Sequence, residues 1–192
     1  MPMKTGCSNT CWRKKTAMTA LEPTSIIVPL PITLRAATQH DLPKLEWYGQ
    51  YAHFRHLFRR AFREQQLGRR SILVADCNQF PIGCLFVQFA RADDGPIKRA
   101  YLYSFRVMEM FRGQGIGTRL LSYAETIIGQ RSHTWALISV AKDNPAARRL
   151  YERLGYRVYA EDEGRWHYVD HRGNLRYVHE PCWMLQKPIL MG

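Results

Sequence analysis

Two short segments of the sequence carry residue types and spacings that could do chemistry. The first is residues 112–117, RGQGIG, in which three glycines alternate with larger residues between a strand-like and a helix-like stretch. Glycine lets the backbone approach a ligand closely, and the free N–H groups and dipole of a helix N-terminus attract an anion. The segment therefore predicts a cradle for a diphosphate group, although the same residues would also make an ordinary turn.

The spacing of these glycines excludes two common nucleotide-binding motifs. No Gly-Lys-Ser/Thr follows, so the segment is not a P-loop. Gly113, Gly115 and Gly117 lack the third glycine of G-x-G-x-x-G, and the preceding strand belongs to an antiparallel run. A diphosphate site here would be of another kind.

The second segment is residues 144–156, NPAARRLYERLGY. Asn144 is a favourable N-cap and Pro145 suits the first helical position, so a helix begins directly after a predicted strand. Tyr151 lies about two helical turns after Asn144, so both side chains can face one cleft. The alternative interpretation is that Tyr151 simply packs in the core as an aromatic residue.

Together the two segments resemble the GNAT superfamily of N-acetyltransferases. The family pattern Arg/Gln-x-x-Gly-x-Gly/Ala is met by Arg112, Gly115 and Gly117. Its second pattern, Asn-x-x-Ala-x-x-x-Tyr-x-x-x-Gly-Phe/Tyr, is met by Asn144, Ala147, Tyr151, Gly155 and Tyr156. The resemblance covers residues 32–188 and implies a mixed α/β fold, with a splayed mixed β-sheet flanked by helices.

The resemblance also implies a set of site residues. Acetyl-CoA, as co-substrate and without a metal, would lie in the gap between the strands at 101–108 and 134–140. The main chain of Val107, Met108 and Glu109 would pair with the pantetheine arm. The pyrophosphate would bind the N–H groups of Arg112, Gly113, Gln114, Gly115, Ile116 and Gly117. Asn144 would contact the pantetheine arm or fix the loop beneath it, Ala147 would complete the cofactor site, and Tyr151 would stand near the sulfur as the catalytic acid.

The function that follows is acetyl transfer from acetyl-CoA to a primary amine of a peptide, a protein or a small metabolite, by direct attack in a ternary complex. Such transfer needs a neutral amine, a positioned carbonyl and a protonated leaving group. Tyrosine, with a pKa near ~10, is a workable proton donor to a thiolate. The alternative is a CoA-binding sensor or interaction module that does no transfer.

No general base is evident from the sequence. The strand before the first segment carries no carboxylate, which is the main support for the non-catalytic alternative. Glu109 is the nearest acid, and a water relay through Ser104, Tyr103 or a backbone carbonyl would serve as well. His133 and Asp143 are expected to be a strand-end and a loop residue in solvent.

The acceptor site is expected between residues 48–60 and 166–183. The second range is rich in aromatic and imidazole side chains, namely Trp166, His167, Tyr168, His171, His179 and Trp183. The first adjoins a basic helix that carries Arg55, Arg59, Arg60, Arg63, Arg69 and Arg70. These charges would repel a polycation and favour a peptide or protein amine or a small metabolite. The alternatives are that the aromatics pack a hairpin and the arginines form a solvated face.

Hydrophobic periodicity predicts the elements that position these residues. Leu42, Leu45, Tyr48 and Tyr51 fall on helical spacing after a capping pair, Thr38 and Asp41. A first strand is expected over 32–36 and a basic amphipathic helix over 53–70. Three successive antiparallel strands are expected over 71–75, 82–90 and 100–107, with a turn at 93–96. Helices at 115–129 and 145–154 then enclose a strand at 134–140, as in a crossover unit. A strand at 156–159 and one long or two short hairpins over 165–187 complete the chain.

Composition bounds the remaining expectations. The chain has 192 residues, 46% of them hydrophobic, which suits one folded domain over 32–188 behind a flexible basic tail at 1–31. No apolar run approaches the ~20 residues of a membrane span. Lysine and arginine exceed acids by 28 to 16, giving +12, yet this charge is spread out and matches no nucleic-acid module, so nucleic acid is a less favoured partner.

Five scattered cysteines suit a reducing compartment, so a cytoplasmic location is expected. Cys7 and Cys11 lack a second ligand pair for zinc. A monomer or a homodimer is expected.

Overall fold

A seven-stranded sheet organises the chain, for which the computed structural model describes residues 25–89 and 97–189. Its strand order is β1-β2-β3-β4-β5-β9-β6, and neighbours are antiparallel except for the parallel pair β4 and β5. The strands are β1 (Thr33–Ala36), β2 (Arg70–Cys77), β3 (Phe80–Phe89), β4 (Arg99–Val107), β5 (Trp135–Ala141), β6 (Arg157–Asp162) and β9 (Cys182–Pro188). The predicted antiparallel run and crossover unit are thus confirmed.

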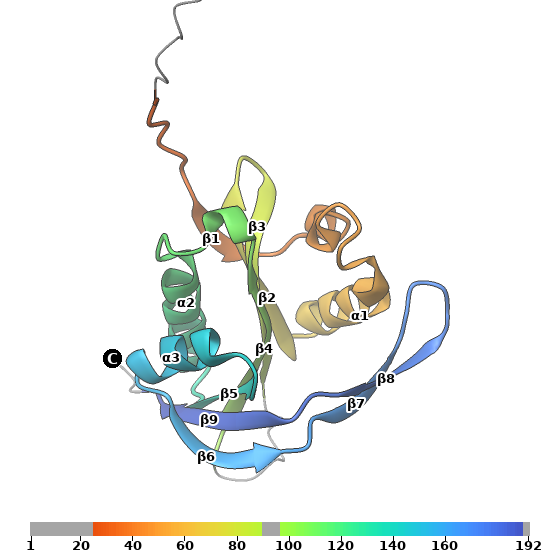
Figure 1. Cartoon of the computed structure of the whole chain (residues 1–192), viewed down its shortest axis with the longest axis vertical. Helices are drawn as coiled ribbons and strands as arrows, with labels where there is room; N and C mark the ends of the chain where they lie inside the picture. The colour runs from red at the N-terminus through yellow and green to blue at the C-terminus, as the bar shows by residue number, and fades with distance from the viewer. Residues whose placement is uncertain (1–24, 90–96, 190–192) are drawn as a thin grey trace, which may run out of the picture.

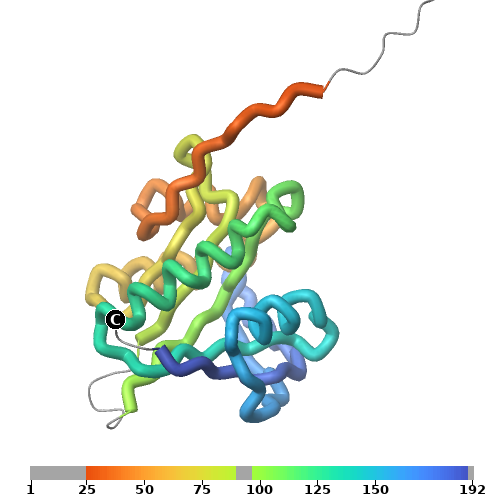
Figure 2. Tube along the Cα trace, turned by 90° about the vertical axis from the view of Figure 1, so that its left-hand side faces the viewer, coloured from red at the N-terminus to blue at the C-terminus, as the bar shows by residue number. Residues whose placement is uncertain are grey.

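Helices cover both faces of this sheet (Figure 1). On one face lies α1 (Arg55–Gln66), and on the other lie α2 (Ile116–Gln130) and α3 (Pro145–Arg153). Figure 2 shows α2 lying over the strands on its face. Each face has its own buried cluster, one around Leu120 and Leu185 and one around Phe58 and Phe86, so two hydrophobic layers enclose the sheet.

The central feature is a splay between β4 and β5. Their parallel pairing runs only from Arg99 opposite Trp135 to Leu102 opposite Ile138, after which the strands separate. A bulge in β4 begins at the same place, because its register with β3 shifts and Ser104 has a positive φ of 51°. The predicted gap between the strands at 101–108 and 134–140 is therefore confirmed.

The segment between β1 and α1 differs from its prediction. The helical spacing over residues 42–51 does not produce an α-helix, and three short 3-10 turns form instead, Gln39–Asp41, Lys44–Glu46 and Ala52–Phe54. Trp47 and Tyr48 have φ values of 43° and 57°, which a continuing right-handed helix does not permit. The Thr38–Asp41 pair forms as predicted, since the Asp41 carboxylate accepts from the Thr38 N–H at 2.7 Å.

The closing segment forms one long, bent hairpin, as one of the two predicted alternatives has it, because the Glu180 N–H donates to the Gly164 carbonyl at 3.1 Å and joins its outer part to the pairing of β6 with β9. Strands β7 (Arg165–Val169) and β8 (Leu175–His179) pair with each other and extend past α1, and β9 then enters the large sheet between β5 and β6. The basic helix is shorter than predicted, from Arg55 to Gln66 rather than 53–70.

Some expectations fall outside the described residues. These are the predicted tail as far as residue 24, with Cys7 and Cys11, and the whole of the predicted turn at 93–96. Residues 25–31 form neither helix nor strand. No helix in the described part of the chain is long and apolar enough to cross a membrane.

Candidate active site

The glycine segment forms an open loop at the N-terminus of α2. Gly113 and Gly115 have φ values of +76° and +79°, and a Cβ added to either would meet no atom within 4 Å. The Arg119 N–H bonds back to the Gly115 carbonyl at 3.0 Å, whereas within the described residues the N–H groups of 113–118 donate to no protein acceptor. Free amides, open space and the helix dipole suit a bound phosphate. The loop therefore fits the diphosphate of CoA. The Arg112 N–H, which was predicted to take part, does not, because it donates to the Glu109 carbonyl at 3.0 Å.

The other residues of the loop support its shape. Arg112 Nε donates to the Val107 carbonyl at 3.0 Å, which ties the loop to the end of β4, and Gln114 Nε2 donates to the Met110 carbonyl at 3.3 Å. Gly117 has a packing role, because a Cβ there would lie 3.3 Å from the Phe105 ring. Ile116 is buried and begins α2.

The end of β4 presents backbone groups to the gap. The Met108 N–H donates to the Ile82 carbonyl of β3 at 2.8 Å. Because backbone groups alternate in direction along a strand, those of Val107 point away from β3, towards β5. Glu109 is exposed and begins a short turn, Glu109–Phe111. Of the three residues predicted to pair with a pantetheine arm, Val107 has its N–H directed at the gap, whereas its carbonyl already accepts from Arg112 Nε and the Met108 N–H already donates to Ile82.

Tyr151 lies on α3, facing β4 at the splay. Its side chain is buried, and its ring centroid is 6.2 Å from those of both Phe105 and Tyr156. Burial, with a smaller effect of Tyr101, raises the pKa of the Tyr151 phenol well above its usual value, so the group is protonated at neutral pH. Tyr151 is thus a core residue that carries a protonated phenol beside the gap.

The start of α3 is fixed as the sequence predicts. Asn144 Oδ1 accepts from the Ala147 N–H at 3.1 Å, and Pro145 is the first helical residue. Ala147 packs against the core cluster of this face. The contact seen for Asn144 therefore holds the loop at the end of β5, which is one of the two roles that the resemblance implies for it.

On the opposite face of the sheet, hydroxyl groups line the splay. Tyr101 and Ser139 bridge β4 and β5 with an O–O distance of 2.7 Å, one residue beyond the last parallel pair on β5. Tyr103, stacked on Tyr101 with centroids 6.1 Å apart, accepts from Arg70 Nη1. Burial raises the pKa of both phenols. The Tyr101–Ser139 pair was not predicted, and the strand periodicity of β4 was the one signal that could have indicated Tyr101.

Two further side chains on this face, those of Arg106 and His53, were not identified as site residues from the sequence. The Arg106 guanidinium carbon lies 4.1 Å from the centre of the Tyr51 ring and 5.3 Å from that of Phe58. Its Nε and Nη2 are buried and have no hydrogen-bond partner within the described residues. Burial and the charge of Arg106 lower the pKa of His53, so its imidazole is neutral at neutral pH.

The other base candidates are placed apart from this face or are already engaged. Glu109 lies on the cradle side of β4. The Ser104 carbonyl accepts from the Cys84 thiol at 3.5 Å. The prediction that His133 lies in solvent was wrong, because its side chain is buried, with Nδ1 2.9 Å from the Arg131 carbonyl oxygen. Asp143 is exposed, as predicted.

Only some of the residues that were predicted to line the acceptor site lie together in the structure. The Phe54 ring lies 5.0 Å from Tyr168 and 6.3 Å from Trp166, so β7 contacts the turn before α1. Trp183 lies elsewhere, on β9, with Lys142 Nζ at 4.8 Å and Arg148 Cζ at 4.9 Å from its ring centre. The hairpin aromatics therefore both pack and border the acceptor side, whereas Trp183 does not belong to it.

Comparisons with known proteins agree with this geometry. The "Uncharacterized N-acetyltransferase YesJ" of Bacillus subtilis is 35% identical over 75 residues, covering 39% of this chain and 42% of that protein. N-alpha-acetyltransferase 30 of Schizosaccharomyces pombe is 29% identical over 82 residues, covering 39% and 55%. The chain thus spans about half the length of these curated relatives.

Solved structures share the fold. The ribosomal-protein-S18-alanine N-acetyltransferase of Escherichia coli has a TM-score of 0.61 at 22% identity, over 84% of this chain and 96% of that one. NAA60 of Arabidopsis thaliana, in complex with a bisubstrate analogue, has a TM-score of 0.63 at 17% identity, over 84% and 100%. The model of the family described as "Acetyltransferase (GNAT) family" matches residues 37–156. The chain belongs to the GNAT acetyltransferase family.

Proposed function

We propose that this chain transfers an acetyl group from acetyl-CoA to a primary amine. The observation that carries the proposal is the gap between β4 and β5, which has an anion cradle at one end and the protonated Tyr151 beside it. When bound, acetyl-CoA supplies the activated acetyl group.

The residues of this chain would divide the work between the two faces of the sheet. On the α2 and α3 face, the N–H groups of 113–118 would hold a diphosphate and the Val107 N–H would donate to the pantetheine arm. The Tyr151 phenol would give its proton to the departing sulfur. On the α1 face, the amine enters beside Tyr101 and Ser139, whose linked hydroxyls pass its proton to water. Direct attack needs no nucleophile from the protein.

The acceptor is a peptide, a protein or a small-molecule amine. The names of relatives cover both kinds, since N-alpha-acetyltransferase 30 is accompanied by an S-alkylcysteine N-acetyltransferase of Bacillus subtilis, 25% identical over 103 residues, 52% of this chain and 58% of that protein. We further propose that residues 32–188 are the catalytic domain and that the protein works in the cytoplasm. The free thiols of Cys77, Cys84 and Cys182 support that location.

The reaction is tested by following free CoA thiol when acetyl-CoA is mixed with protein and a panel of peptides and amino acids. We expect acceptor-dependent thiol release, with the acetylated amine identified by mass spectrometry. Acetyl-CoA binding without release for any acceptor would contradict transfer and support the CoA-binding module. Nothing in the described residues or the comparisons favours that alternative now.

A further inference from the structure

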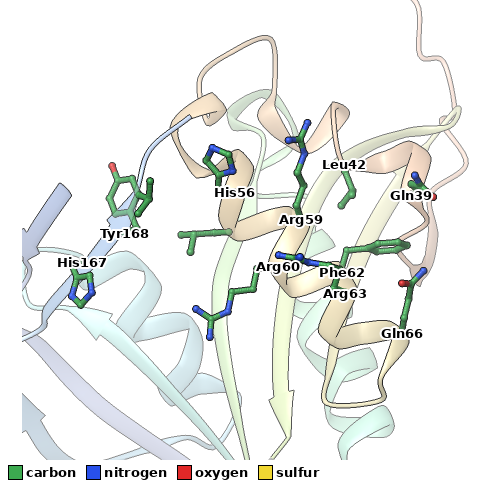
Figure 3. A pocket seen from close by; sticks show the side chains of 12 residues that line it. Gln39, Leu42, His56, Arg59, Arg60, Phe62, Arg63, Gln66, His167 and Tyr168 are labelled. Atoms are coloured by element: carbon green, nitrogen blue, oxygen red, sulfur yellow. The ribbon is translucent and has the colours of Figure 1, made fainter. Parts of the chain in front are cut away.

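A groove of about 810 Å³ lies between the outward face of α1 and strand β7 (Figure 3). One wall is a stripe of α1 that includes Arg59, Arg60 and Arg63, and the opposite wall is residues 167–169 of β7. This size lies within the range of ligand-binding clefts. The groove is separate from the phosphate cradle, which lies on the other face of the sheet.

The groove is strongly basic. Its twelve lining residues include three arginines and two histidines and no acid. Within the described residues Arg59 and Arg63 form no ion pair, and Arg60 makes a single exposed contact, with Nε 3.2 Å from Glu64 Oε1. An exposed pair of this kind neutralises little of the local potential. The wall therefore attracts an anionic ligand.

Strand β7, which forms the opposite wall, also restricts the kind of ligand that the groove can bind. Successive side chains of a strand point to opposite faces, yet the consecutive residues His167, Tyr168 and Val169 all line the groove. No residue of β8 lines the groove, so the groove runs along the edge of β7 that is not paired with β8. In the described part of the chain β7 pairs with β8 alone, so the N–H and C=O groups along its other edge are free to bind an extended peptide.

One end of the groove approaches the acceptor face of the sheet. Arg60, which lines the groove, and Arg70 both contact the Glu64 carboxylate, Arg60 with its Nε at 3.2 Å. Arg70 Nη1 also donates to the hydroxyl of Tyr103 on β4, and Tyr103 stacks on Tyr101. A chain lying in the groove could thus run on towards the hydroxyl groups at the splay.

We propose that this groove binds an acidic, extended segment of a polypeptide acceptor, whose backbone pairs with the edge of β7 while its carboxylates contact Arg59 and Arg63. This proposal rests on the proposed function and narrows it to acidic peptides or proteins. The free strand edge favours a peptide over a polynucleotide, which has no amide backbone to pair with β7.

The test is fluorescence anisotropy with a C-terminally labelled peptide of about twelve residues that alternates Glu and Val and has a free N-terminal amine. The matched peptide has Gln for Glu, and a labelled single-stranded DNA of equal length is the third probe. We expect the Glu peptide to bind at least about tenfold more tightly than the Gln peptide and the DNA, with an affinity that falls as salt rises.

Variants separate the groove from general charge. Arg59→Glu combined with Arg63→Glu should weaken binding of the Glu peptide about tenfold or more. Arg69→Glu combined with Arg157→Glu makes the same charge change at exposed arginines outside the groove and should leave the affinity within about twofold. Both variants should keep the thermal midpoint of the native protein, which confirms that they fold.

Peptides N-methylated at alternate residues test the strand pairing. Because only every second residue of an edge strand pairs with its neighbour, methylation in one frame should abolish binding and methylation in the other should spare it. Equal binding of both frames, equal binding of the Gln peptide, or tighter binding of DNA would overturn the proposal.

Peptide binding is measured without acetyl-CoA. The proposal of a peptide groove and the proposal of acetyl transfer can therefore be contradicted independently of each other. A protein that binds acetyl-CoA and not the Glu peptide contradicts the groove alone. A protein that binds the peptide but releases no thiol from acetyl-CoA contradicts the transferase alone.

Discussion

Tyr151 is the residue on which the proposed chemistry most depends. Its phenol is buried beside Phe105 where β4 and β5 have already separated, and burial raises its pKa, so it is protonated at neutral pH. Burial also raises the basicity of a thiolate that departs in the same low-dielectric surroundings, so the phenol can give it a proton. The acid role can therefore be tested apart from packing.

Replacing Tyr151 with Phe removes the proton donor and keeps the ring. We expect kcat for acetyl transfer to fall about 10²-fold or more, with the Kd of acetyl-CoA changed less than about threefold. Tyr156→Phe is the matched control, because that phenol is buried in the same cluster and lacks a hydrogen-bond partner in the described structure. A Tyr151→Phe variant that lost acetyl-CoA affinity and kept kcat would contradict the acid role.

Single residues could be predicted where the signal is local in sequence. The glycines of the cradle, the Asn144 cap and the placement of Tyr151 all follow from spacing within one loop or helix. The Tyr101–Ser139 bridge could not be predicted in the same way, because it joins residues 38 positions apart. Their meeting depends on the register of the parallel pair and on where that pairing ends.

At the scale of elements, the cradle loop depends on left-handed backbone. Gly115→Ala places a methyl group in the space that the loop leaves open, at a φ of +79°. We expect acetyl-CoA affinity to fall about tenfold or more and stability to fall by about 1–3 kcal/mol. Both changes are measurable by titration calorimetry and thermal unfolding.

Gly49→Ala is the control for backbone strain. Gly49 has a φ of +95° and equally open surroundings, but it lies in the turns before α1. Its replacement should cost similar stability and leave acetyl-CoA affinity unchanged. If the two variants lost affinity equally, the loop would have no direct role in binding.

The junction of β1 with the first turn depends on a buried ion pair. Burial alone would raise the pKa of Asp41, but hydrogen bonds from Arg35 and Thr38 outweigh it and hold the pKa at about 2, below its ordinary value of 3.8. Because the folded-state pKa is lowered, the ionised carboxylate stabilises the fold above pH 3.8, and this contribution disappears as the pH falls to about 2.

We therefore expect Asp41→Asn to lower the free energy of unfolding at pH 7 by about 2 kcal/mol. The difference from the native protein should shrink between pH 4 and pH 2 in denaturant titrations, within the range set by the two pKa values. Asp143→Asn, at an exposed position, should have no measurable effect at either pH. A difference that stayed constant across this range would exclude the carboxylate charge as its source.

The prediction of secondary structure was wrong where the backbone conformation did not follow the helical spacing of the apolar residues. The apolar residues at 42, 45, 48 and 51 share a helical spacing, yet positive φ at Trp47 and Tyr48 breaks the segment into 3-10 turns. Neither residue is a usual left-handed former, so the sequence carries no signal for the break. Long amphipathic elements such as α2 were predicted to within a residue or two because their period is sustained.

At the scale of the whole molecule, the proposed function has two ligands meet at the splay from opposite faces of one sheet. The α2 and α3 face offers the cradle, Val107 and Tyr151, and the α1 face offers the Tyr101–Ser139 bridge and the basic groove beyond it. The fold class and the gap could be predicted from the resemblance of two motifs. The groove could not, because it depends on how the β7–β8 hairpin lies against α1.

Calorimetric titration of acetyl-CoA into the protein tests this account most directly. ATP and desulfo-CoA serve as comparison ligands at physiological salt, because a protein with a net charge of +12 attracts any polyphosphate. The gap and the cradle together predict a Kd in the micromolar range, about −8 kcal/mol, for acetyl-CoA and clearly weaker binding of ATP, which lacks the pantetheine arm. Absence of acetyl-CoA binding, or equal binding of ATP, would contradict the assignment of the gap as the cofactor site.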